Sequence, residues 1–253
     1  MSQRIIIAGH SHTAALGFPL STGNLPTIIP LERDDFEGLT GAWPRDEAYW
    51  EELIRVAQNR TVIISWNGNQ HISHFLLLSE PEFEFVLPKS INNRYNHLND
   101  RIDKSKKLVP FRMLLENYRP SFSHQIEILK RLLSVEGCKP IIIGTPPPRG
   151  DSTLEDAFDA KASWFSEFAQ LINVDIGSVN LSSATFRLKC WMALQFAAEE
   201  VASAIGARFI PSVPAAQNQE GFLRSEYAHD FTHANGLYGD LMLNFIKEQL
   251  QGI

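Results

Sequence analysis

The chain has 253 residues, of which 44% are hydrophobic and 21% charged, and its formal net charge is −6. This composition is typical of a globular protein and excludes a disordered chain, while the acidic balance argues against a nucleic-acid partner. No run approaches the ~18 apolar residues of a membrane span, and the apolar run near residue 4 is too short for a signal-peptide core. Cys138 and Cys190 have neither metal-ligand nor disulfide spacing. We therefore expect a cytoplasmic protein with no membrane partner.

Short apolar, β-branched runs alternate along the chain with longer segments of helical periodicity. The predicted strands lie at residues 4–8, 27–31, 61–66, 140–144 and 208–211, and the predicted helices at 46–59, 111–136, 185–205 and 237–250. Continuous apolar strands are typical of a parallel sheet that is buried on both faces. The alternation therefore predicts an α/β fold with a mostly parallel central sheet.

The polar segment 70–110 interrupts this alternation. Its part from Lys89 to Lys107 holds six basic and two acidic residues. Such a run is either solvated surface or a field that attracts an anionic substrate, and both interpretations stay open. Since no segment is a convincing linker, we expect one domain over residues 1–253 with an insertion or lid at 70–110.

A serine follows the first predicted strand, in the sequence Gly9-His10-Ser11-His12. It lies at a strand-to-helix turn, on the carboxyl edge of the sheet where open α/β folds bind ligands. Its hydroxyl is accessible there, and its backbone N–H can face a developing oxyanion. The alternative is a serine that only caps the helix.

An aspartate and a histidine precede the last predicted helix, in the sequence Asp230-Phe-Thr-His233. Their three-residue spacing can bring a carboxylate and an imidazole to the same side of a turn. The carboxylate then orients the ring, and the ring can accept the serine proton. The alternative is that Asp230 caps the turn and His233 fills a polar gap.

Two further segments lie at ends of predicted elements. Asn67-Gly68-Asn69-Gln70 follows the central strand, so that side-chain amides emerge at the same sheet edge as Ser11 and can donate to an oxyanion. Gly41, with Gly38 close by, lies between the second predicted strand and the next helix and can offer an unobstructed backbone N–H.

In this order the four segments resemble the conserved blocks of the SGNH (GDSL-like) hydrolase family, over nearly the whole chain. The resemblance implies a flavodoxin-like three-layer sandwich, with Ser11 as nucleophile, His233 as general base and Asp230 as its orienting carboxylate. It also implies an oxyanion hole made by the N–H groups of Ser11 and Gly41 and the amide of Asn69. No cofactor is required.

The chain departs from the family pattern at three positions. His10 replaces the aspartate of the first block, Asn67 replaces the glycine of the third, and Gln70 replaces its final aspartate. None of these changes removes a member of the proton-transfer set. They leave Asn67 as an alternative to Asn69 for the amide that faces the substrate.

The resemblance predicts a serine esterase that acts on a short-chain acyl ester of a carbohydrate or small metabolite. Candidates for substrate contact are His12 and Asn67, which lie within the four segments, and Trp66 and Trp43, which lie beside them. An acyltransferase would use the same residues, with an alcohol in place of water. An SGNH-like binding protein that has lost turnover is the third alternative.

Gly9-His10-Ser11-His12 also resembles the GHxH block of calcineurin-like metallophosphoesterases, and His71 and His74 add further imidazoles. A metal site would require the carboxylate motifs of that family. Those motifs are missing from the sequence, and in that family GHxH lies late in the chain. We therefore expect no metal.

Overall fold

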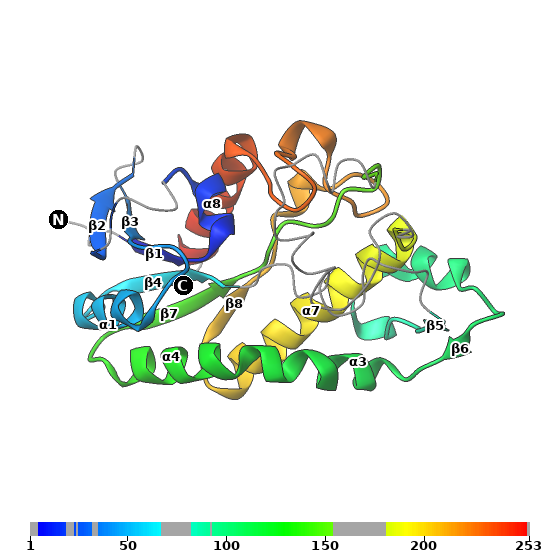
Figure 1. Ribbon diagram of the computed structural model, residues 1–253, viewed down its shortest axis with the longest axis horizontal. Coiled ribbons are helices and arrows are strands. Elements are labelled where there is room, and N and C mark those ends of the chain that lie inside the picture. Colours follow the sequence, from blue (N-terminus) through cyan, green and yellow to red (C-terminus); the bar gives the residue numbers. More distant parts are fainter. Residues whose placement is uncertain are drawn as a thin grey trace.

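The structure is a computed structural model that describes residues 5–18, 23, 25–31, 35–66, 82–91, 93–153 and 181–251 (Figure 1). A six-stranded sheet has the order β2 (Thr27–Pro30), β3 (Phe36–Thr40), β1 (Ile5–Gly9), β4 (Thr61–Ser65), β7 (Lys139–Ile143) and β8 (Arg208–Ile210). Only β2 is antiparallel to its neighbour. Without β2, the strand order is the 2-1-3-4-5 order of flavodoxin-like folds. The predicted fold class is confirmed.

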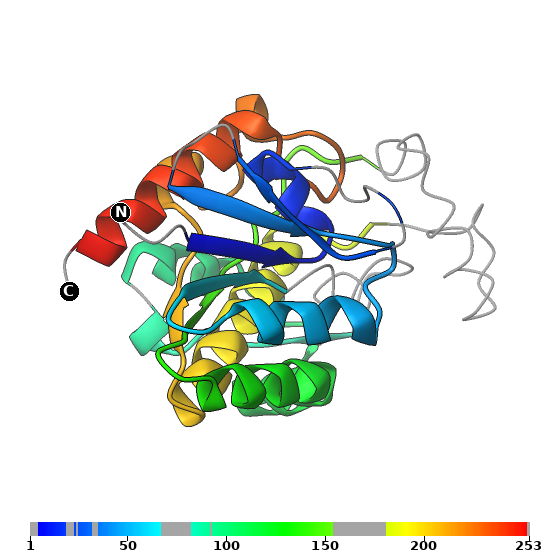
Figure 2. The same cartoon turned by 90° about the vertical axis from the view of Figure 1, so that its left-hand side faces the viewer.

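Successive side chains of the strands face opposite layers of helices. Ile7 and Ile63 pack against α8 (Gly236–Gln251) and the 3₁₀ helix η1 (Ser11–Leu16). Ile6, Val62 and Ile64 pack on the other side against α1 (Glu47–Val56) and α4 (Ser123–Ser134). Figure 2 shows α8 in red above the blue strands, with α1 and the green α4 below them. Each such side chain contributes about 1.5–3 kcal/mol by leaving water, so the alternation fixes the three layers.

The apolar patterns located β1, β4, β7 and β8 and the helices α1, α7 (Ala184–Ala204) and α8. Strand β3 was missed because its sequence, FEGLT, interrupts the apolar pattern with a carboxylate, a glycine and a threonine. In the fold, Glu37 forms an ion pair with Arg60, which directly precedes β4 on the other side of β1. The expected helix 111–136 is divided into α3 (Phe111–Tyr118), η4 (Arg119–Phe122) and α4, because Pro120 has no N–H to donate.

Strand β2 also differs from expectation. It was read as a buried strand of the parallel sheet, but it is an antiparallel edge strand whose residues are exposed or partly buried. An edge position explains how Pro30 is tolerated, because a proline there removes no ladder hydrogen bond from the interior of the sheet.

The described part of the expected insertion packs against α7. It contains β5 (Phe83–Glu84), the 3₁₀ helices η2 (Lys89–Ile91) and η3 (Asn93–Arg101), and β6 (Lys107–Leu108). Figure 1 shows these elements at the end of α7 that lies away from the sheet. Phe85 and Leu98 join the core of this region, and the fully buried Lys189 of α7 pairs with Glu84 at 2.9 Å. Residues 70–81 lie outside the described residues, and the single-domain organisation stays a prediction.

Candidate active site

A glycine-dependent turn sets the position of Ser11. Gly9 ends β1 with φ 138°, and a Cβ on it would lie 2.1 Å from the carbonyl oxygen of Ser65 on β4, so only glycine fits. The N–H of His10 donates to that carbonyl at 3.0 Å, and the N–H and hydroxyl of Thr13 donate to the carbonyl of His10 at 3.0 and 2.7 Å. The turn is therefore held on both sides, and Ser11 is partly buried at the first position of η1.

Asp230 and His233 form a hydrogen-bonded pair just before α8. Nδ1 of His233 lies 2.9 Å from Oδ2 of Asp230 and 3.1 Å from Oδ1. Oδ1 also accepts the backbone N–H groups of Thr232 and His233, each at 2.7 Å. Asp230 thus caps its own turn through the backbone N–H groups and also binds the imidazole of His233, so both expected contacts are present.

The charge of Asp230 is stabilised by these contacts. Burial alone would raise its pKa, but the hydrogen bond and charge of His233, with the two backbone N–H groups, lower the pKa well below its usual value. An ionised Asp230 keeps the proton of the neutral ring on Nδ1, which leaves Nε2 as an acceptor. Nε2 is buried and has no hydrogen-bond partner among the residues that the structure describes.

The serine and the histidine line the same cavity. Its volume is about 420 Å³, and it is lined by Ser11, Ala14, Ala15, His229, Asp230, His233, Ala234, Asn235 and Gly236. The two sides of this cavity meet because α8 packs directly on η1. A Cβ at Gly239 of α8 would lie 1.6 Å from the carbonyl oxygen of Ala15, so glycine permits this close approach.

Of the residues expected to bind the oxyanion, the structure describes Gly41 but neither Asn67 nor Asn69. Gly41 directly follows β3, which neighbours β1 in the sheet, and it is buried. Gly38 lies within β3 and pairs with Ile7, so Gly41 is the glycine at the carboxyl edge. Asn67 and Asn69 lie outside the described residues, and their roles stay predictions.

The expected substrate-contact residues that the structure describes differ in exposure. Trp43 is 47% exposed. Trp66 is 6% exposed and stacks on Trp50 with ring centroids 4.3 Å apart, so its indole is part of the core. His12 is 5% exposed, and its ring lies 5.1 Å from the ring of His233. Of these three, only Trp43 is well exposed to a ligand.

Some residues that hold the site together were given no role by the sequence analysis. Asn235 donates through Nδ2 to the carbonyl of Glu226 at 2.8 Å and accepts from the N–H of Leu237 through Oδ1 at 3.0 Å. It thereby ties the loop of His233 to the start of α8. An asparagine just before an apolar periodic segment is a helix N-terminal signal, and this signal could have located it. Arg45 and Tyr49, near the start of α1, also bind the backbone of Gly9 beside the site, and no sequence pattern marked them.

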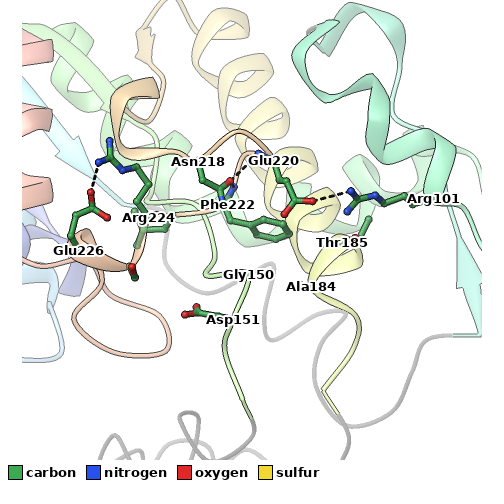
Figure 3. Close-up of a pocket in the computed structure, with 12 residues that line it drawn as sticks. Arg101, Gly150, Asp151, Ala184, Thr185, Asn218, Glu220, Phe222, Arg224 and Glu226 are labelled. Carbon is green, nitrogen blue, oxygen red and sulfur yellow. Dashed lines mark hydrogen bonds and ion pairs between the residues drawn. The ribbon is translucent and has the colours of Figure 1, made fainter.

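Another hollow of about 480 Å³ is lined by charged groups (Figure 3). Arg101, from the basic segment of the expected insertion, pairs there with Glu220 at 2.9 Å. Arg224 pairs with Glu226 in the same hollow. These carboxylates offset the positive field that both arginines would offer to an anion.

Described residues contain no helix long and apolar enough to cross a membrane. Over the same residues there is no cluster of three or more His, Cys, Asp or Glu side chains that could hold a metal ion. His71 and His74 lie outside the described residues.

His10, next to the candidate nucleophile, is surrounded by three indoles. Its ring centroid lies 5.9, 5.8 and 5.6 Å from those of Trp43, Trp50 and Trp66. Burial, and then the charges of Arg45 and His124, lower the pKa of His10 from 6.5 to about 4. The ring is therefore neutral at neutral pH.

This shift predicts that acid destabilises the fold through His10. Between pH 6.5 and 4 the unfolded chain binds a proton at this ring that the folded chain does not bind, so the free energy of unfolding decreases as pH falls. The decrease from this group is at most about 3 kcal/mol. Urea denaturation at pH 7, 5.5 and 4 measures it, and His10→Asn should flatten the profile by that amount while His124→Asn should not. Parallel profiles for wild type and His10→Asn would contradict the prediction.

Comparisons with known proteins find similar solved structures but no match in sequence. No family model matches the chain, and no curated protein matches it in sequence. Solved structures similar to it include a GDSL-like lipase from Bacteroides thetaiotaomicron VPI-5482, with TM-score 0.41, 11% identity and coverage of 99% of this chain and 89% of that chain. A carbohydrate acetylesterase from Sinorhizobium meliloti has TM-score 0.42 and 11% identity over 98% of this chain and 99% of that one. An aryl esterase from M. smegmatis has TM-score 0.40 and 14% identity over 99% of both chains.

Proposed function

We propose that the protein is a serine esterase of the SGNH type, which hydrolyses a short-chain acyl ester of a carbohydrate or small metabolite. The observation that carries this proposal is the shared cavity, which is lined by Ser11 and by the hydrogen-bonded pair of His233 and Asp230. The order of the four blocks in the sequence, together with the flavodoxin-like strand order, supports the choice of family. The exposed indole of Trp43 offers an apolar face suited to a sugar or an aryl group.

The first half of the reaction forms an acyl-enzyme. Oγ of Ser11 attacks the ester carbonyl carbon while Nε2 of His233 takes the hydroxyl proton, and the carbonyl oxygen becomes an oxyanion. Backbone N–H groups of Ser11 and Gly41, with the Asn69 amide, bind that oxyanion. Collapse of the tetrahedral intermediate breaks the bond to the alcohol oxygen, which receives the proton from His233. The ionised Asp230 stabilises the imidazolium between these two transfers.

The second half repeats the transfers with water. His233 takes a proton from a water molecule, whose oxygen attacks the acyl carbon, and then returns the proton to Oγ of Ser11 as the acid leaves. An alcohol in place of water would make the same site an acyltransferase. Product analysis with and without an added sugar alcohol separates these two outcomes.

The proposed compartment is the cytoplasm, and the proposed partner is the small-molecule ester, with no nucleic-acid or membrane partner. Cys138 and Cys190 are both free thiols, as expected in a reducing compartment. Burial raises the pKa of the Cys138 thiol to about 11 and that of Cys190 well above its usual value, so neither is a reactive thiolate at neutral pH.

The test is intact-mass detection of a fluorophosphonate adduct on the folded protein. An activated serine attacks the phosphorus and expels fluoride, whereas an ordinary capping serine does not react. We expect one adduct on wild type and none on Ser11→Ala. Ser123→Ala, which changes the exposed serine at the first position of α4, should label like wild type. EDTA should leave labelling and hydrolysis unchanged.

Three results would contradict the proposal. An unlabelled wild type would favour the idle binding protein, and an adduct that persists in Ser11→Ala would place the reactive group elsewhere. Hydrolysis that EDTA abolishes and Ser11→Ala spares would favour a metal-dependent phosphoesterase.

A further inference from the structure

Strands β1 and β3 lose their mutual pairing just before the two expected oxyanion donors. Their described ladder runs from Ile5 and Phe36 to Ile7 and Gly38. Beyond that pair, β1 continues to Gly9 and then to Ser11, while β3 continues to Thr40 and then to Gly41. A gap in the ladder leaves peptide groups that need other partners, because buried N–H and C=O groups are rarely left unpaired.

Tyr49 bridges the two strands in this gap. Its hydroxyl donates to the carbonyl of Leu39 at 2.9 Å and accepts the N–H of Gly9 at 2.9 Å. Tyr49 is fully buried, so neither strand can replace this bond with water. The hydroxyl therefore acts as an extra ladder rung between the ends of β1 and β3.

Arg45 makes a second bridge one step closer to the site. Its Nε donates to the carbonyl of Gly9 at 3.1 Å, and its Nη1 donates to the carbonyls of Gly41 and Ala42 at 2.9 and 3.2 Å. The guanidinium carbon lies 4.4 Å from the ring centroid of Tyr49, and Arg45 is 7% exposed. The planar, multi-donor guanidinium group suits several carbonyls at once, which the single ammonium of lysine does not.

The start of α1 aims both side chains at the gap. Arg45 directly precedes the N-cap residue Asp46, and Tyr49 lies in the first turn of α1, so both side chains reach the gap from one short segment. Asp46 caps α1 by accepting the N–H of Tyr49 at 3.0 Å, which fixes the first turn.

We infer that Arg45 and Tyr49 are positioning residues that hold the Ser11 and Gly41 segments at the separation required for an oxyanion hole. This inference rests on the proposed function. Neither side chain is a catalytic residue, because both act through the backbone of Gly9, Leu39, Gly41 and Ala42. Their contribution is preorganisation: the donors are held in place before charge develops on the substrate oxygen.

The test uses Tyr49→Phe and Arg45→Lys, which remove the bridges with little change of volume or charge. With p-nitrophenyl acetate as substrate, we expect kcat to fall by about 10–100-fold, the loss found when groups that orient the ligands of a metal site are removed. KM should change little, because the change acts on the transition state. The inhibition constant of phenylboronic acid, whose tetrahedral adduct with a serine mimics the intermediate, should rise in parallel.

Matched controls separate this effect from general damage to the core. Tyr118→Phe removes another buried tyrosine hydroxyl, which donates to the carbonyl of Cys190 at 3.2 Å between α3 and α7. Arg187→Lys removes another buried guanidinium, which donates to the carbonyl of Ser182 at 2.6 Å. Both controls should retain wild-type kcat at a temperature where all variants are folded by circular dichroism.

The outcomes distinguish the inference from the proposed function. A wild type without a fluorophosphonate adduct on Ser11 would overturn both. If the wild type is labelled on Ser11 but Tyr49→Phe has the same kcat as Tyr118→Phe, the positioning role alone is overturned. A loss confined to KM, or an unchanged boronate inhibition constant, would do the same. If Arg45→Lys fails to fold, Tyr49→Phe still decides.

Discussion

Hydrolysis of p-nitrophenyl acetate by His233→Ala is expected to be slower than wild type by a factor on the order of 10⁴–10⁶. The variant removes the only group that the proposed mechanism uses to move a proton between Ser11 and the leaving alcohol. Asp230 cannot substitute, because an aspartate carboxylate is a much weaker base than an imidazole. The measurement is kcat at neutral pH, with the rate of fluorophosphonate labelling as a second readout.

His124→Ala is the matched control, since His124 is half exposed on α4 and does not line the cavity of Ser11. Its kcat should stay close to wild type. Added imidazole should restore part of the rate of His233→Ala, because it can occupy the space of the lost ring, and it should restore nothing in Ser11→Ala. A His233→Ala enzyme that keeps a tenth of its activity would contradict the role of general base.

Glu84→Ala is expected to lower the free energy of unfolding by about 3–5 kcal/mol, the cost of leaving a buried charge without its partner. Nζ of Lys189 is completely buried, 2.9 Å from Glu84 and 4.5 Å from the ring centroid of Phe85. Burial already lowers the pKa of Lys189, with Glu84 acting in the opposite direction. Without the carboxylate, the ammonium must lose its proton or draw water into the core. Urea denaturation at pH 7 measures the loss.

The exposed pair of Arg101 and Glu220 supplies the control for this prediction. It has the same length of 2.9 Å, but both side chains are about half exposed, so Glu220→Ala should cost less than about 1 kcal/mol. Replacing both buried partners, in Glu84→Leu with Lys189→Met, should recover most of the loss. If Glu84→Ala and Glu220→Ala lower the free energy of unfolding equally, burial does not determine how much an ion pair contributes to stability.

The apolar runs predicted most of the sheet because burial on both faces leaves a plain signal in the sequence. The strands β1, β4 and β7 occupy the centre of the sheet, and their side chains are almost all buried. The signal fails at the edge of the sheet, where β2 is partly exposed and β3 carries Glu37. The interruption at Pro120 was visible in the sequence, yet helical periodicity continues on both sides of it and hides the break.

The sequence predicted those site residues that carry reactive side chains and lie at the end of a strand or the start of a helix. Ser11 follows a strand, and Asp230 and His233 precede a helix at a spacing that permits direct contact. The contacts of Arg45 and Tyr49 were not predictable in this way. Their partner Gly9 lies 36 and 40 residues away along the chain, and they bind its backbone carbonyl and N–H groups, which are the same whatever the residue.

The packing of α8 on η1 also determines when during biosynthesis the site can assemble. Ser11 and β1 precede His233 and α8 in the sequence, so the serine is synthesised before the histidine and the helix that follows it. A growing chain therefore displays its serine without a base and should be inert towards esters. We expect the complete site to form only when Gly239 packs against Ala15 and His233 joins Ser11 at the shared cavity.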